Sequence, residues 1–372
     1  MNSFVINNVK VVTPFEVLEN GFVYIKKGVI DVIEHSSNQR LHRSCSVIDG
    51  QGRWLFPGMV DMFSTALEKE LEPTFDALDT KLVSNGITTV CHALSSSAVR
   101  TGLMATDEND AGETRFGRLK KDCSIRHSIN LVHAIGDEKY FPVVEALINR
   151  RELQLISIVA GAGTSFKELD RQQQKNEFGR ISDFIELVAE KARKYEIRIA
   201  SCREGTASLI NHMKKLGIKI LEFPQEPETA AEAARGGMLL LSGAPSVLRN
   251  SGTGPIPMLC SDDAPASMLN AAFALHGRQN MSMAEIFRKL SLDPASALGI
   301  DRRLGSIECG KLADLVLVKE ANGRPLVEKA FINGFRVYEK NSILHEDQHF
   351  PRSMHLKSSY GASRQEGITI VK

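Results

Sequence analysis

The chain has 372 residues, of which 42% are hydrophobic, so it is long enough to bury a sizeable core. Its 46 basic and 45 acidic side chains give a formal net charge of +1, which argues against nucleic acid or an acidic membrane surface as a partner. Its six cysteines form no CxxC pair, and no signal peptide or membrane-spanning apolar run is evident, so we expect a cytoplasmic protein with reduced thiols.

The first 56 residues are typical of a small β-layer. Short strands are predicted at Val9–Thr13, Phe22–Lys26, Val29–Glu34 and Val47–Gly50. A Lys-Gly step separates the second strand from the third, which favours a hairpin.

The stretch Arg53–Lys69 marks a change of architecture. An apolar run, Trp54–Phe56, meets Pro57-Gly58 and continues into a short strand that reaches Phe63. Proline fixes φ and glycine tolerates positive φ, so this dipeptide is predicted to turn the chain from one layer of structure into another.

From Gly58 the pattern alternates between strands and helices. Several of the strands are nearly continuous apolar runs, as expected for strands covered on both faces. Eight strands are predicted, at Gly58–Phe63, Ile87–Ala93, Ile129–Ile135, Gln154–Ala160, Ile197–Cys202, Lys219–Phe223, Met238–Ser242 and Met258–Ser261. Five helical stretches lie between them, at Phe75–Asn85, Tyr140–Arg151, Ile181–Tyr195, Gly205–Leu216 and Thr229–Arg235. This alternation predicts a (β/α)₈ barrel of the TIM type.

After the last barrel strand, three helices are followed by a return to β-structure. The helices are predicted at Ala264–Gly277, Ser282–Leu290 and Pro294–Leu298, and the strands at Leu315–Val318, Val327–Ile332 and Arg336–Tyr338. Neither terminal set of strands could bury a core alone, so we expect both termini to form one small β-sandwich domain. The predicted domains are residues 1–56 and 304–340 for the β-sandwich, 57–303 for the barrel, and 341–372 for a polar tail.

Two motifs resemble the amidohydrolase superfamily. The Pro57-Gly58 strand resembles the point where those enzymes begin their barrel, and residues 293–316, DPASALGIDRRLGSIECGKLADLV, resemble their closing signature. Residues 84–90 and 218–273 narrow the resemblance to the diphosphatases of phosphonate metabolism, in the carbon–phosphorus lyase pathway. The resemblance covers about residues 5–338.

This resemblance implies a divalent metal site, with zinc or manganese, at the carboxyl ends of the barrel strands. The positions where the superfamily has ligands instead carry Phe63 and Thr65 on strand 1, Ala134 on strand 3 and Cys202 on strand 5. Asp262 on strand 8 is retained. A lone carboxylate and a lone thiol would not hold a catalytic metal pair, so we expect no metal and no other cofactor.

Each remaining residue has a functional and a structural interpretation. Asp262 is a candidate acid/base, or a carboxylate that pairs with Arg203 or caps the helix near Pro265. Cys202 is a candidate nucleophile, with His92 or His133 as its base, or a buried inert thiol. Arg249, in the glycine- and serine-rich loop Arg249–Gly254, is a candidate to bind phosphate together with backbone N–H groups. Arg203 and Glu204 are candidate substrate-binding residues, or an internal ion pair. His133 is predicted to face the helices, because adjacent strand residues point to opposite faces.

Two functional hypotheses follow. The first is a degenerate, pseudoenzyme-like member without metal-dependent hydrolysis that binds a phosphorylated or anionic small molecule or a protein partner. The alternative is an active hydrolase, for a phosphoanhydride or a C–N bond, with Asp262 as acid/base and Arg203 or Arg249 holding the substrate. The resemblance also implies a homodimer.

Overall fold

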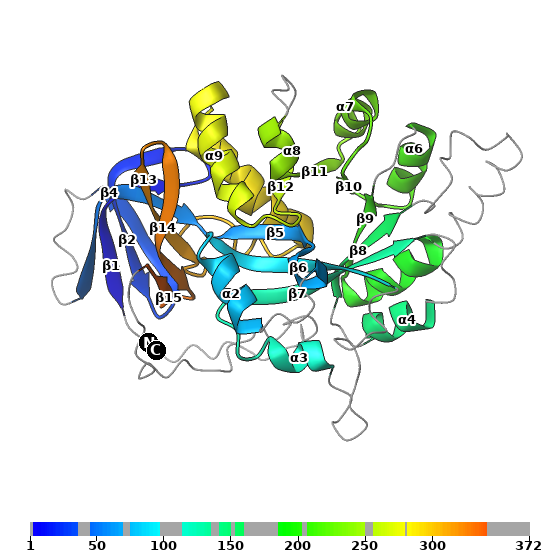
Figure 1. Ribbon diagram of the computed structural model, residues 1–372, viewed down its shortest axis with the longest axis horizontal. Helices are drawn as coiled ribbons and strands as arrows, with labels where there is room; N and C mark the ends of the chain where they lie inside the picture. Colours follow the sequence, from blue (N-terminus) through cyan, green and yellow to red (C-terminus); the bar gives the residue numbers. More distant parts are fainter. Residues whose placement is uncertain are drawn as a thin grey trace, which may run out of the picture.

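The chain folds into a parallel barrel beside a mixed sheet (Figure 1), as a computed structural model shows. The structure describes residues 3–35, 45–69, 75–96, 114–134, 141–149, 153–159, 185–202, 207–249, 256–279 and 281–340. Within these residues, no helix is long and apolar enough to cross a membrane.

The barrel contains eight parallel strands in chain order, and all eight agree with the predicted positions. The strands are β5 (Met59–Ser64), β6 (Ile87–Ser95), β7 (Arg126–Ala134), β8 (Leu153–Val159), β9 (Arg198–Cys202), β10 (Ile220–Glu222), β11 (Leu239–Gly243) and β12 (Met258–Cys260). The predicted (β/α)₈ fold is therefore confirmed.

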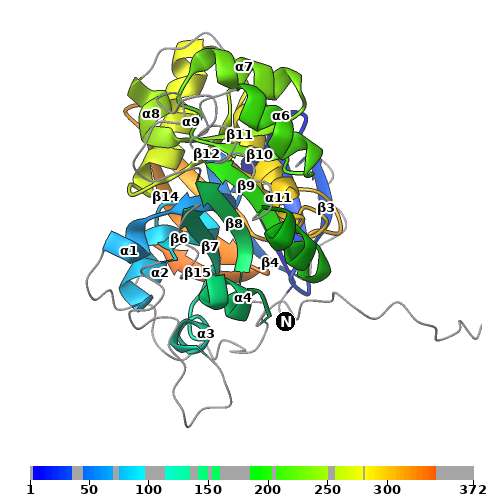
Figure 2. The same cartoon turned by 90° about the vertical axis from the view of Figure 1, so that its right-hand side faces the viewer.

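Helices cover the outside of this barrel (Figure 2). They include α1 (Ala66–Lys69), α2 (Phe75–Val83), α3 (Arg115–Leu119), α4 (Phe141–Asn149), α6 (Ala207–Lys215), α7 (Pro227–Arg235), α8 (Ala244–Arg249), α9 (Ala266–Gln279), α10 (Met283–Phe287) and α11 (Asp293–Leu298). Residues 185–195 are also helical. The predicted helix at Ser282–Leu290 is in fact α10 followed by a π-helical turn, η5 (Arg288–Leu292).

The barrel closes where its first strand meets the residues after its last. Ser64 and Asp262 form a parallel bridge. The amide of Thr65 donates to the carbonyl of Asp262 at 2.6 Å, and the amide of Asp262 donates to the carbonyl of Phe63 at 3.1 Å. The retained acid of strand 8 therefore lies directly beside the strand-1 positions where the superfamily carries its ligands.

Strands from both termini form one mixed sheet of seven strands, which confirms the composite β-domain. Its order is β15 (Phe335–Glu339), β14 (Arg324–Ile332), β13 (Leu315–Ala321), β4 (Ser46–Pro57), β1 (Phe4–Val12), β2 (Val17–Lys26) and β3 (Val29–His35). Asn333 and Gly334 form the hairpin turn between β14 and β15, and both residues have the positive φ that a primed turn requires.

Strand β4 is longer than predicted and leads into the barrel. It extends beyond the predicted strand at Val47–Gly50 to include the apolar run Trp54–Phe56 and Pro57, because this segment pairs with β13 along one edge. The ring of Phe56 stacks on that of Phe287 from α10, with centroids 3.8 Å apart and planes 4° apart. The end of β4 therefore packs directly against the helices of the barrel.

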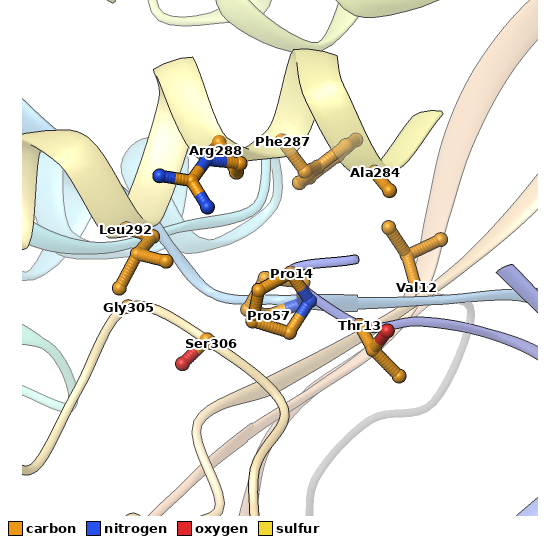
Figure 3. Close-up of a pocket in the computed structure, with 10 residues that line it drawn as sticks. All are labelled: Val12, Thr13, Pro14, Pro57, Ala284, Phe287, Arg288, Leu292, Gly305 and Ser306. Carbon is orange, nitrogen blue, oxygen red and sulfur yellow. The ribbon is translucent and has the colours of Figure 1, made fainter. Parts of the chain in front are cut away.

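A second contact joins the β-domain to the start of β7. The guanidinium of Arg126 pairs with Asp314, and it also donates to Oδ1 of Asn333 at 2.6 Å. Nearby, a pocket lies between Thr13 and Pro14 of the β-domain and Arg288 and Ser306 (Figure 3). It has room for about one water molecule, so this junction is packed rather than hollow.

Gly58 is required for a different reason from the one predicted. Its φ is not positive, so it does not supply a left-handed turn. A Cβ at this position would lie 2.1 Å from Oγ1 of Thr88, at the start of β6. The Pro-Gly step changes layers as expected, but the glycine is there because β6 passes too close for a side chain.

We expect Gly58→Ala to lower the free energy of unfolding by about 1–3 kcal/mol, because the added methyl must displace Thr88 in a packed interior. Gly277→Ala is the matched control. A Cβ on Gly277 meets nothing within 4 Å, and this helical position should be stabilised slightly by alanine. Urea titration of both variants measures the difference, and equal effects would contradict the steric explanation.

Candidate functional site

Polar side chains line the interior of the barrel near the carboxyl ends of its strands. Alternate residues of each strand point inward, which brings together one side chain from each of seven strands. This interior polar cluster consists of Asp61, Cys91, Asn130, Ser157, Cys202, Glu222 and Cys260. All seven are buried, so the cluster lies in a low-dielectric environment beneath the mouth.

Asp61 joins the two ends of the barrel wall. Its Oδ1 accepts hydrogen bonds from the amides of Ser261 (3.1 Å) and Phe63 (3.3 Å), while its Oδ2 has no hydrogen-bond partner among the described residues. Burial raises the pKa of Asp61 to about 7, although Ser261 and Phe63 oppose the shift. This carboxyl therefore retains its proton to a higher pH than an exposed aspartate does.

Glu222 is fully buried on the opposite side of the interior cluster. Burial raises its pKa to about 7, against the opposing influence of Ser157, Cys202 and Asn130. Ser157 instead donates to Oδ1 of Asn130 at 2.8 Å, and within the described chain neither oxygen of Glu222 completes a hydrogen bond of normal geometry. Glu222 is thus a second carboxyl that retains a proton to near-neutral pH.

The mouth above this cluster is partly closed by aromatic rings. Phe63 at the end of β5 meets Phe223 edge to face, with centroids 4.9 Å apart, and only 7% of Phe63 is exposed. Oγ1 of Thr65 donates to Oδ1 of Asp262 at 3.4 Å. Asp262 has φ of 55°, a left-handed conformation that is uncommon for residues other than glycine.

The residues at the mouth do not fit the metal pair that the resemblance implies. The strand ends carry Phe63, Ala134 and Cys202 at ligand positions, and the chain has no histidine between His133 and His212. The one group of three metal-binding side chains found to converge in the described part of the chain lies elsewhere, in the helix layer. A divalent ion needs several convergent donors, so we derive no metal-dependent step for this site.

The structure separates the histidines from the interior cluster. His92 follows Cys91 on β6, so its side chain points away from the interior cluster and toward the helices. It contacts the rings of Phe75 and Phe116, which belong to α2 and α3. On β7, His133 and Asn130 are three positions apart, so their side chains point to opposite faces of the strand. This agrees with the predicted orientation of His133, which is buried. Neither histidine is placed to serve as a base for Cys202.

The remaining predicted residues are only partly described. Arg203 and Glu204 lie outside the described residues, as does the loop after Arg249. Arg249 is exposed at the end of α8 and donates to Oγ of Ser246 at 3.3 Å. The roles of all three, and of Asp262, therefore stay predictions.

Sequence reasoning missed the buried polar residues of the cluster. Asn130, Ser157 and Glu222 each interrupt an apolar strand at an inward-facing position, and that interruption is the signal that could have identified them. Asp61 lies in the strand that follows Pro57-Gly58, but its hydrogen-bond partner Ser261 is 200 positions away in the sequence.

Comparison with known proteins gives a consistent result. Residues 243–337 match the model of the amidohydrolase family. The chain is 27% identical to the alpha-D-ribose 1-methylphosphonate 5-triphosphate diphosphatase of Escherichia coli K12, over 90% of this chain and all of that protein. A shorter match, 37% identical over 16% of each chain, is to the imidazolonepropionase of Pseudoalteromonas atlantica.

Solved structures show the same fold. The N-acetylglucosamine-6-phosphate deacetylase of Pasteurella multocida matches with a TM-score of 0.64 at 13% identity, over 90% of this chain and 99% of that one. A triazine hydrolase variant matches with a TM-score of 0.62 at 16% identity, over 92% and 96%. The family match over residues 243–337, the full-length similarity to the phosphonate diphosphatase and the shared fold agree with the predicted resemblance to the amidohydrolase superfamily.

Proposed function

We propose that this protein is a metal-independent member of the superfamily that binds a phosphorylated or other anionic small molecule at the mouth of its barrel. The observation that carries the proposal is the replacement of ligands at strand ends by a phenyl ring, a methyl group and a buried thiol. Phe63 also packs on Phe223, so its ring contributes to the walls of the mouth instead of leaving a gap where an ion could sit.

The ligand class follows from the related diphosphatase, whose name specifies a phosphorylated ribose phosphonate, and from the chemistry of the mouth. Arg249 offers an exposed guanidinium, a group that binds phosphate oxygens in bidentate fashion. Asp61 and Glu222, with pKa values of about 7, retain protons that a neutral carboxyl can donate. Partial protonation also reduces their repulsion of an anion.

One observation favours the alternative, an active hydrolase with Asp262 as acid/base. Left-handed backbone at a residue other than glycine tends to occur at functional sites, and Asp262 adopts it at the mouth. In this scheme Asp262 would activate water for attack on a phosphoanhydride or C–N bond, without a metal ion.

Turnover measurements separate the two proposals. After chelator treatment, we expect no hydrolysis of nucleoside triphosphates or cyclic amides above the blank, and none after addition of Zn²⁺ or Mn²⁺. Turnover in metal-free protein that Asp262→Asn abolishes would establish the alternative. Turnover that requires added metal and is lost in Asp262→Asn would overturn the metal-independent proposal.

Ligand binding is tested at Arg249. We expect inorganic pyrophosphate or ribose 5-phosphate to raise the melting temperature of the wild type, and Arg249→Ala to weaken binding by about tenfold or more, because a charge-assisted hydrogen bond is lost. Arg235→Ala is the matched control, since Arg235 is also an exposed arginine at a helix end, on α7. Equal losses in both variants, or no shift in the wild type, would count against an anion site here.

A further inference from the structure

A group of metal-binding side chains lies between the barrel wall and its outer helices. Asp79 of α2, Cys123 after α3 and His127 of β7 each place one donor atom within 4.8 Å of the other two. His92 of β6 is adjacent, with Nε2 2.8 Å from Nδ1 of His127. His92 and His127 lie on the helix-facing side of β6 and β7, whereas the interior cluster occupies the other side of the same strands.

Asp79 is held in place by the backbone before β7. Its Oδ2 accepts from the amide of Ser124 at 2.9 Å, and its Oδ1 accepts from the amide of Ile125 at 3.1 Å. Oδ1 also lies 3.0 Å from Nε2 of His127. A carboxylate can accept in about four directions. A metal ion could therefore bind Asp79 in place of its contact with His127 and leave both backbone hydrogen bonds intact.

From this arrangement we propose that Asp79, Cys123 and His127 form a zinc site. Zn²⁺ is coordinated in proteins by cysteine sulfur, imidazole nitrogen and carboxylate oxygen, whereas Mg²⁺ and Ca²⁺ prefer oxygen ligands. Two donors on one tetrahedral zinc ion lie about 3.3 Å apart, calculated from zinc–ligand distances of about 2.0–2.1 Å. The present separation of 3.0 Å between Asp79 and His127 needs only a small change to reach that value.

His92 is the positioning residue of the site. With zinc on Nε2 of His127, the Nδ1–H of that ring donates to Nε2 of His92, which fixes the tautomer that leaves Nε2 free for the metal. His92 is fully buried, and its Nε2 is the atom that faces His127, so this nitrogen is the acceptor. Its own Nδ1 then carries the proton.

The charge around Cys123 is suited to a cation. Three carboxylates, Asp79, Asp76 and Asp122, lie close enough to the thiol to act on it electrostatically. Their negative charge attracts a divalent ion to the position where the three donor atoms converge.

The test is metal binding by the full chain, purified under reducing conditions without chelator. We expect about one zinc per chain by elemental analysis, and the protein stripped of metal should bind one Co²⁺ with a thiolate-to-cobalt charge-transfer band. Cys123→Ser should abolish the band, and His127→Gln should weaken binding by at least about tenfold. His92→Gln should weaken cobalt binding by about 10–100-fold but keep the charge-transfer band. If His92 had only a structural role, the affinity for cobalt would not change.

Two control variants locate the metal. Cys309→Ser changes an exposed free cysteine and should leave the band unchanged. Asp262→Asn should also leave it unchanged, whereas loss of metal in that variant would place the ion at the mouth and overturn both this inference and the proposed function. Absence of stoichiometric Co²⁺ binding by the wild type, or a band that persists in a correctly folded Cys123→Ser variant, would overturn the zinc site alone.

Discussion

Replacement of Glu222 by glutamine should make the protein more stable than the wild type as the pH rises. The buried carboxyl has a pKa of about 7 in the folded protein, against 4.5 for an unperturbed glutamate. Between these two values the unfolded chain loses its proton and the folded chain keeps it, so the folded state loses stability as the pH increases. The folded state has its full stability below pH 4.5, and the decrease in stability is complete just above pH 7.

The expected size of this effect is about 3 kcal/mol, because each pH unit between the two pKa values corresponds to about 1.4 kcal/mol. Urea unfolding of Glu222→Gln and of the wild type at several pH values from 5 to 8 measures it as a growing difference between the two proteins. Glu16→Gln, which changes an exposed carboxyl, is the control. A constant difference between Glu222→Gln and wild type across this range would show that Glu222 is ionised in the folded protein.

Replacement of Phe56 by alanine should lower the free energy of unfolding by about 3–5 kcal/mol, the range for loss of a buried phenyl ring. Only 1% of Phe56 is exposed, and besides Phe287 it contacts Phe273 edge to face and Trp54 by stacking. The truncation leaves a cavity between β4 and the helices of the barrel, so both parts of the protein lose packing at once.

Phe15→Ala is the matched control for Phe56, because 79% of Phe15 is exposed and its removal should change stability little. Unfolding should be followed by two probes, Trp54 fluorescence for the β-domain and far-ultraviolet circular dichroism for the helices of the barrel. We expect the two transitions to coincide and to move together in Phe56→Ala. Separate transitions, with only one of them affected, would mean that Phe56 does not couple the β-domain to the barrel.

The barrel could be predicted because its signals are local. Each of its eight strands is an apolar run of the right length bounded by turn residues, and the alternation with helices fixes the class of fold. The extent of β4 could not be predicted in this way. Trp54–Pro57 becomes part of that strand through pairing with β13, whose residues lie more than 250 positions later in the chain.

The candidate site was harder to predict because burial and proximity determine its chemistry. The motif at the start of the barrel predicted where Phe63 and Thr65 would lie, and the structure does place them beside Asp262. The raised pKa values of Asp61 and Glu222 depend on enclosure by strands from the whole barrel, which no short stretch of sequence reveals. The group around His127 likewise joins α2 to β7 across 48 positions.

The placement of β4 between β1 and β13 has a consequence for synthesis on the ribosome. The last barrel strand ends at Cys260, but the strand that covers the open edge of β4 begins only at Leu315. A nascent chain can therefore complete its barrel while the backbone groups of Trp54–Phe56 still face water, ready to pair with another polypeptide. We therefore expect that edge to remain open to pairing with other chains until β13 has been synthesised.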